Sequence, residues 1–104
     1  MVLAKNLRES VKELLDSTCV IKSSEVIITG VKCSIQGISV DDVLYKDVGS
    51  LTNIVAIGYF AYDVYPNEGD LVIYEDESFR VMRVIKHYYQ NKLIYVEARL
   101  GALT

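Results

Sequence analysis

Alternation of apolar and polar residues with a period of two runs through the last third of the sequence and constrains the fold most strongly. Three alternating runs, separated by short turns at 76–78 and 90–91, occupy residues 71–75, 79–88 and 92–100. One face of the last run carries Ile94, Val96, Ala98 and Leu100. A period of two is typical of strands with one buried face, and short turns join antiparallel neighbours. This part of the chain is therefore predicted to form an antiparallel meander.

Three further strands are predicted upstream, at residues 19–21, 25–36 and 54–62. A hairpin turn at 22–24 separates the first two. Gly30 lies inside the second run, where a missing side chain often marks a bulge or a bend. The run at 54–62 is apolar throughout, which predicts a strand that is covered on both faces. Strands are thus expected over residues 18–36 and 54–100, about six in all.

An amphipathic helix is predicted over residues 3–16, ahead of the first strand. Its apolar positions recur at helical spacing, at Leu3, Leu7, Val11, Leu14 and Leu15. Charged side chains fill most positions between them, and a small sheet needs an element to cover its apolar face. The sequence as a whole predicts one mainly β domain over residues 1–104, a small antiparallel β-barrel or sandwich of about six strands with an N-terminal α-helix packed on the core.

A long connection at residues 37–53 breaks the β pattern. Ser39, followed three residues later by Asp42, resembles a capping box, and Gly49 suits the C-terminus of a helix. We therefore expect a long loop that carries a short helix. Long connections in compact domains are usually functional or disordered, so this loop is a candidate functional element.

Charge is unevenly distributed over the 104 residues, which carry 11 Lys and Arg against 14 Asp and Glu. The resulting net charge of −3 argues against general binding of nucleic acid. Residues 63–77 contain six acidic residues and no Lys or Arg, whereas residues 80–92 contain four Lys or Arg and no acidic residue. Two interpretations remain open. Opposite charges pair between neighbouring strands of one subunit, or they form two surfaces that meet between subunits.

No residues with catalytic or metal-binding spacing stand out, and we expect no enzymatic activity and no cofactor. His87 is the single histidine, and nothing in the spacing supports a catalytic triad or dyad around it. The six glycines form no phosphate-binding loop. Cys19 and Cys33 are expected to be reduced, buried thiols. No secretory or membrane-spanning segment is predicted, which indicates a soluble protein of the cytoplasm.

Eight tyrosines and no tryptophan form a clear compositional bias. Tyr88 and Tyr89, with Arg83, suggest a stacking platform for single-stranded nucleic acid in a small barrel, although the acidic net charge weakens this interpretation. Tyrosine also suits protein interfaces because it combines an apolar ring with a polar tip. Interaction with other proteins is therefore the favoured class of function, and a small nucleic-acid-binding barrel is the alternative.

Two segments in the C-terminal half resemble a known family. They read Tyr-Pro-Asn-Glu-Gly-Asp-Leu-Val-Ile-Tyr at residues 65–74 and Glu-Ser-Phe-Arg-Val-Met-Arg-Val at residues 77–84. A Gly-Asp turn before an apolar strand that ends in Tyr, followed by an aromatic-Arg-Val strand, is similar to the small head-tail connector proteins of tailed phages, of the head-completion or stopper type. The order of the elements over about residues 26–100 also resembles that family.

This resemblance implies a structural virion protein that forms a homo-oligomeric ring below the portal, retains packaged DNA and offers a docking surface for the tail. The implied partners are the portal or an adaptor protein and the tail proteins. DNA passes through the channel without specific binding, and no membrane is involved. The implied location is the virion neck, with assembly in the host cytoplasm. A tail-completion or terminator protein, which forms a ring on the tail side, is an alternative within the same class.

The resemblance also suggests which residues carry the function. By analogy with the family, the long connection lines or gates the channel, and its candidate residues are Ser39, Asp41, Asp42, Tyr45, Lys46 and Asp47. A ring needs two complementary faces on each subunit, which the acidic and basic segments can supply. The candidate residues for this subunit interface are Asp70, Glu75, Glu77, Arg80, Arg83 and Lys86.

Overall fold

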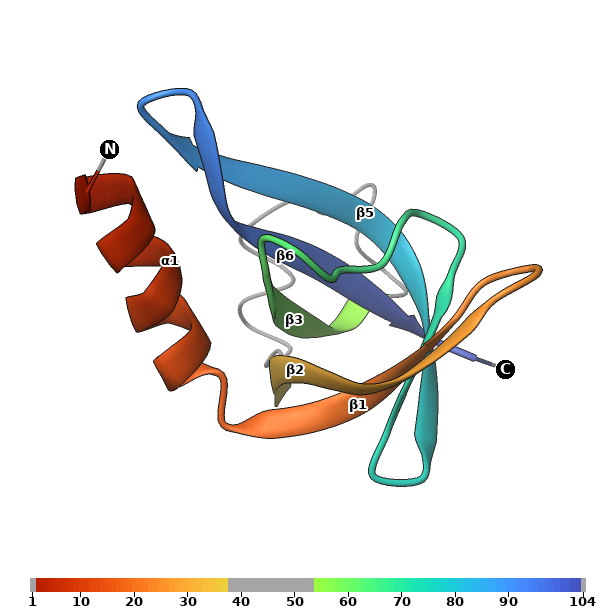
Figure 1. Cartoon of the computed structure of the whole chain (residues 1–104). Helices are drawn as coiled ribbons and strands as arrows, with labels where there is room; N and C mark the ends of the chain where they lie inside the picture. Colours follow the sequence, from red (N-terminus) through yellow and green to blue (C-terminus); the bar gives the residue numbers. More distant parts are fainter. Residues whose placement is uncertain (1, 38–53, 104) are drawn as a thin grey trace.

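The computed structural model describes residues 2–37 and 54–103 as a closed antiparallel β-barrel with a helix beside it (Figure 1). The elements are α1 (Val2–Leu14), β1 (Ser17–Lys22), β2 (Ile27–Gly37), β3 (Ile54–Ala61), β4 (Leu71–Tyr74), β5 (Glu77–Tyr89) and β6 (Lys92–Ala102). Around the barrel the strands follow the order β1-β2-β3-β6-β5-β4, with β4 pairing back onto β1. The mainly β, six-stranded prediction is confirmed, and of its two forms the barrel is the one observed.

The long connection predicted at 37–53 lies almost entirely outside the described residues. Gly37 is the last residue of β2, and residues 38–53 are not described. The predicted short helix therefore falls outside the described residues. So do all six candidate channel residues, which are Ser39, Asp41, Asp42, Tyr45, Lys46 and Asp47.

The barrel interior is filled by side chains from every strand. The largest fully buried side chains on the strands are those of Phe60, Leu100, Val72, Val81 and Val96. The predicted inward face of β6 is confirmed, because Ile94, Val96, Ala98 and Leu100 are all buried. Alternation along each strand places these residues on one face, and closure of the sheet turns that face into a core.

Both cysteines belong to this core and are free thiols. Cys19 of β1 and Cys33 of β2 are almost completely inaccessible to solvent. Contact with Cys33 and burial both raise the pKa of the Cys19 thiol. Cys19 is therefore protonated at neutral pH and acts as a small apolar residue.

Strand β3 corrects the expectation of cover on both faces. Its buried residues alternate with partly exposed ones, and Val55 is 40% exposed. A barrel has a single inner face, and of the described elements α1 packs on the outside of this strand, toward one end. The apolar run at 54–62 therefore reflects β propensity on the outer face as well as burial on the inner one.

Two tight hairpins in the C-terminal half have the same geometry. Glu75 and Asp76 join β4 to β5 with φ angles of 49° and 68°, and Gln90 and Asn91 join β5 to β6 with φ angles of 51° and 65°. Positive φ at both central residues is the type I′ turn, whose twist matches that of the strands. The first turn was predicted at 76–78 and lies earlier, because the acidic residues themselves adopt the left-handed conformation.

The bulge predicted at Gly30 is confirmed. Between the pairs Cys19↔Val31 and Ile21↔Ile28, strand β2 has two residues where β1 has one. Gly30 has a φ of 65°, which a residue without a Cβ adopts at low cost. The bulge keeps Ile28 and Val31 facing the same side of β2 as the buried residues of β1.

Helix α1 lies against the outside of β6 and β3 (Figure 1). Its contacts include two made by Arg8, whose Nε donates to the Leu93 carbonyl at 2.8 Å and whose guanidinium lies 4.0 Å from the Tyr62 ring centre. Leu15, just after the helix, is buried, whereas Leu14 is 75% exposed. The helix is therefore held by cation-π and hydrogen-bond contacts as well as by its apolar face. Within the described residues, no helix has the length and apolarity of a membrane span.

Candidate subunit interface

The candidate interface residues are distributed along one hairpin of the barrel, β4–β5. Asp70 immediately precedes β4, and Glu75 lies in the turn. The other four lie along β5: Glu77, Arg80, Arg83 and Lys86. Strands rise by about 3.3 Å per residue, so Glu77 and Lys86 are separated by roughly 30 Å. The hairpin thus presents an acidic tip and a basic strand.

The acidic tip consists of Glu75, Asp76 and Glu77, all of them exposed. The two-residue turn holds these three carboxylates together, because it leaves no room for intervening residues. Like charges this close in sequence repel one another, and no Lys or Arg of the described residues forms an ion pair with them. A basic surface on another molecule therefore offers them a favourable partner.

A second bulge brings Arg80 and Arg83 to the same face of β5. Residues three apart on a regular strand point to opposite faces. Between the pairs Val81↔Leu100 and Arg83↔Arg99, however, β5 contains the extra residue Met82. Both arginines consequently lie on the outer face of the barrel, away from the buried Val81, and both are exposed.

Arg83 lies directly opposite Arg99 of β6. Like charges in this position of an antiparallel pair are destabilising unless an anion offsets them. Arg99 Nε lies 3.4 Å from Glu97 Oε2, and Glu97 Oε1 lies 3.2 Å from His87 Nε2. Arg83 has no ion-pair partner among the described residues. Arg80, Arg83 and Arg99 therefore form a positively charged outer surface, which we call the arginine face.

Two candidate residues, Lys86 and Asp70, do not belong to either surface. Lys86 pairs with the buried Val96, so its Cβ lies on the opposite face of β5 from that of Arg83. Its Nζ lies 5.4 Å from the Tyr65 ring centre. Asp70 accepts a hydrogen bond from the Asn67 N–H at 2.9 Å and so stabilises the turn before β4. The structure thus brings Arg80 and Arg83 together and separates them from Lys86 and Asp70.

Pairing of the two charged segments within one subunit, the other open interpretation, has no support among the described residues. The acidic segment makes its ion pair with the helix instead, through Lys12 Nζ and Asp63 Oδ2 at 2.8 Å. Arg80 Nη1 donates to the Gly69 carbonyl at 3.2 Å rather than to a carboxylate. The charges of the acidic tip and of Arg83 thus remain available to other molecules.

Sequence reasoning missed Arg99 as part of this surface. The alternation of β6 already placed Tyr95, Glu97 and Arg99 on its outward face, which is a usable signal. The pairing of Arg99 with Arg83 depends on the bulge at Met82, and nothing in the sequence marks that bulge, because no glycine is present there.

The tyrosines do not form a single stacking platform. Tyr88 and Tyr89 are exposed at the end of the β5–β6 hairpin, and as consecutive strand residues they point to opposite faces. Tyr95 stacks on His87 with ring centres 4.3 Å apart, while Tyr62 lies under Arg8. Arg83 therefore does not share one face with both exposed tyrosines, which weakens the nucleic-acid alternative.

Comparison of the chain with protein-family models and with curated proteins finds no match. In the described part of the chain, no three His, Cys, Asp or Glu side chains lie close enough together to hold a metal ion.

Proposed function

We propose that this chain is a subunit of a phage head-tail connector ring of the stopper type, which lies below the portal, retains packaged DNA and provides the surface on which the tail docks. The observation that carries the proposal is the separation of charge on one hairpin. The acidic tip is exposed, as are Arg80 and Arg83 of the arginine face, and the two surfaces lie on different parts of the same subunit.

Such a pair of surfaces suits a ring. A heterologous interface joins two different faces of identical subunits and generates a closed ring when the rotation between neighbours closes. Opposite charges on those faces favour the correct encounter and fix its register. In this assembly the acidic tip of one subunit meets the arginine face of the next.

The resemblance to connector proteins adds independent support. Its two segments fall on β4 and on the first half of β5, the hairpin that carries both charged surfaces. The long connection between β2 and β3 has the place in the chain that the resemblance assigns to the channel loop. A small barrel with short hairpins is also a rigid unit from which such a ring can be built.

The proposal is tested by deleting the gene from the phage that carries it and examining the particles by electron microscopy, with purified protein added back to half of the sample. We expect full or leaking heads without tails, which the added protein converts into tailed particles. A normal yield of tailed particles overturns the proposal. Heads that retain their DNA beside tails of abnormal length favour the terminator alternative.

Charge reversal tests the interface in the same assay. Arg83→Glu is expected to abolish rescue, because it places carboxylates opposite the acidic tip. Adding Glu77→Arg to the same chain restores opposite charges at every interface of the ring and is expected to recover rescue. The matched control is Lys92→Glu, an exposed position at the far hairpin, which is expected to rescue normally. Failure of Arg83→Glu to impair rescue contradicts this interface.

A further inference from the structure

Strand β2 has an edge at residues 27–32 that no described strand pairs with. On one side these residues pair with β1, from Lys22↔Ile27 to Thr18↔Lys32. On the other side pairing with β3 begins only at Cys33↔Phe60 and continues toward Gly37. Among the described residues, no strand or turn makes a backbone hydrogen bond to the free side of 27–32. Since alternate residues of a strand direct their N–H and C=O groups to opposite sides, this edge presents unpaired donors and acceptors.

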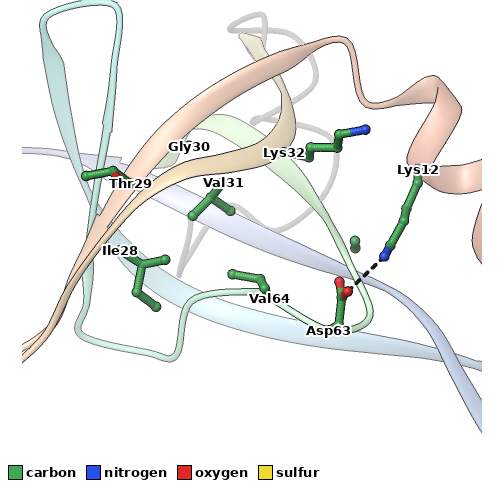
Figure 2. Close-up of a pocket in the computed structure, with 9 residues that line it drawn as sticks. Lys12, Ile28, Thr29, Gly30, Val31, Lys32, Asp63 and Val64 are labelled. Atoms are coloured by element: carbon green, nitrogen blue, oxygen red, sulfur yellow. Dashed lines mark hydrogen bonds and ion pairs between the residues drawn. The ribbon is translucent and has the colours of Figure 1, made fainter.

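A groove runs along this edge (Figure 2). Residues 28–32 form one wall, the segment that follows β3 forms the other with Asp63 and Val64, and the volume is about 250 Å³. A second hollow of about 390 Å³ shares Ile28, Asp63 and Val64 and extends the groove toward Asn67. The free edge therefore lies inside an elongated depression.

The groove has an apolar lining and a charged end. Figure 2 shows Ile28, Val31 and Val64 pointing into the space between its walls. Ile28 is 39% exposed although it pairs with the buried Ile21, because no strand of the described residues pairs with the other side of β2 at this point. At the other end lie Lys12, which is paired with Asp63, and Lys32, which has no ion-pair partner in the described part of the chain.

We propose that this groove binds an extended segment of a partner protein, which adds to the free edge of β2 as a further strand. The unpaired backbone groups require an extended backbone, and β-strand addition is an established mode of peptide recognition. The apolar lining selects apolar residues at alternate positions of the segment, and Lys32 selects an acidic residue at one end. The site uses neither the acidic tip nor the arginine face, so it does not depend on the proposed connector role.

The depth of the edge favours a single strand over a second copy of this chain. Asp63 and Val64 flank the edge, so only a thin, extended segment reaches it. If the β2 edges of two copies paired with each other, the segment with Asp63 and Val64 of one copy would collide with the same segment of the other. The partner therefore contributes a single extended segment that has no helix or strand packed beside it.

The test uses fluorescein-labelled hexapeptides of sequence Glu-Val-Thr-Val-Thr-Val and Val-Thr-Val-Thr-Val-Glu, which cover both strand directions, and fluorescence anisotropy with the full chain. At least one peptide is expected to bind saturably. Methylation of alternate backbone nitrogens of the peptide keeps its side chains but removes hydrogen-bond donors. This change is expected to weaken binding by more than about tenfold. Hydrogen exchange of the wild-type chain is expected to slow at residues 27–32 when the peptide is added.

Variants then test the two selective features. Val64→Lys puts a charge into the apolar lining and is expected to weaken binding about tenfold. Lys32→Glu is expected to weaken binding about two- to fivefold, and a peptide with Lys in place of Glu is expected to recover it. Lys92→Glu, outside the groove, is the matched control and leaves binding unchanged. Circular dichroism establishes that each variant is folded.

Several outcomes overturn the proposal. They are absence of saturable binding by both unmodified peptides, equal binding of the methylated peptides, and slowed exchange at a site other than residues 27–32. Self-association that protects residues 27–32 without any peptide also overturns it, and identifies a second copy of the chain as the occupant of the edge.

Discussion

The two halves of strand β2 contain similar residues but differ in burial. In the second half, Cys33 pairs with both β1 and β3 and is completely buried. In the first half, Ile28 faces the same side as the buried Ile21 opposite it, pairs with no strand but β1 among the described residues, and is 39% exposed. Both halves alternate apolar and polar side chains closely enough to be predicted as one strand. The difference shows that a second neighbouring strand, rather than apolar composition, decides where the wall of this barrel is closed.

The largest expected effect is a difference in stability between substitutions at the closed wall, where β2 pairs with β3, and at the open edge, residues 27–32 of β2. Phe60 pairs with Cys33 and is fully buried, so Phe60→Ala is expected to lower the free energy of unfolding by about 3–5 kcal/mol. Ile28→Ala at the open edge is expected to lower it by less, about 1 kcal/mol, because this side chain is already 39% exposed. Urea denaturation of the two variants measures both values. Similar losses for the two variants would show that Ile28 is as buried as Phe60 and would contradict the difference between the two halves of β2.

Tight packing of the closed wall is tested at Gly58, which pairs with Ile35. A Cβ at position 58 would lie 2.9 Å from Phe60 Cε1 and 3.0 Å from Ile35 Cδ1. Because the Phe60 ring is enclosed by the core, Gly58→Ala is expected to destabilise the chain by about 1–3 kcal/mol. The control is Gly37→Ala, where the added Cβ meets no atom within 4 Å. Thermal denaturation should rank the two variants in this order, and equal stability contradicts the packing of the wall.

The bulge in the open half of β2 is tested at Gly30. Its φ of 65° lies in the left-handed region, although a Cβ there would meet nothing within 4 Å. Gly30→Ala is expected to cost about 1–2 kcal/mol through backbone conformation alone. Gly30→Asn is expected to cost less, because asparagine tolerates this region better than alanine. An alanine variant as stable as the wild type would contradict the bulge.

The smallest effect concerns the ion pair at the end of the groove. The hydrogen bond from Lys12 lowers the pKa of Asp63, and the same contact raises the pKa of Lys12. A lowered carboxyl pKa stabilises the fold above the unfolded-state pKa of about 3.9, and this contribution is lost as the pH falls through the folded-state pKa. Asp63→Asn is therefore expected to be slightly less stable than the wild type at pH 7 and equally stable at a pH below the folded-state pKa of Asp63.

Denaturation at the two pH values measures this difference, and added salt is expected to reduce it because the pair is exposed. Asp76→Asn, which removes an acid without an ion-pair partner in the described part of the chain, is the matched control. A difference that grows as the pH falls would contradict the assigned direction.

Much of the fold was predictable because its determinants are local. Alternation placed the inward residues of β6, and Gly30 marked the bulge in β2. The turn between β4 and β5 was misplaced because Glu75 and Asp76 adopt positive φ without glycine. Burial of both faces of β3 was wrong, since a sequence does not show that a sheet closes on itself.

The candidate interface was predictable only in part. Charge separation along the chain identified the acidic tip and the basic strand. The bulge at Met82, which aligns Arg80 with Arg83 and sets Arg83 opposite Arg99, depends on register between distant strands. The free edge of β2 was not predicted for the same reason, because it follows from the place where pairing with β3 begins.

The proposed ring between portal and tail is tested by a cryo-electron microscopy reconstruction of the neck of the phage that carries the gene. We expect a ring of these barrels immediately below the portal, with the acidic tip of each subunit against the arginine face of its neighbour. A complete neck that contains no copy of the barrel would contradict it.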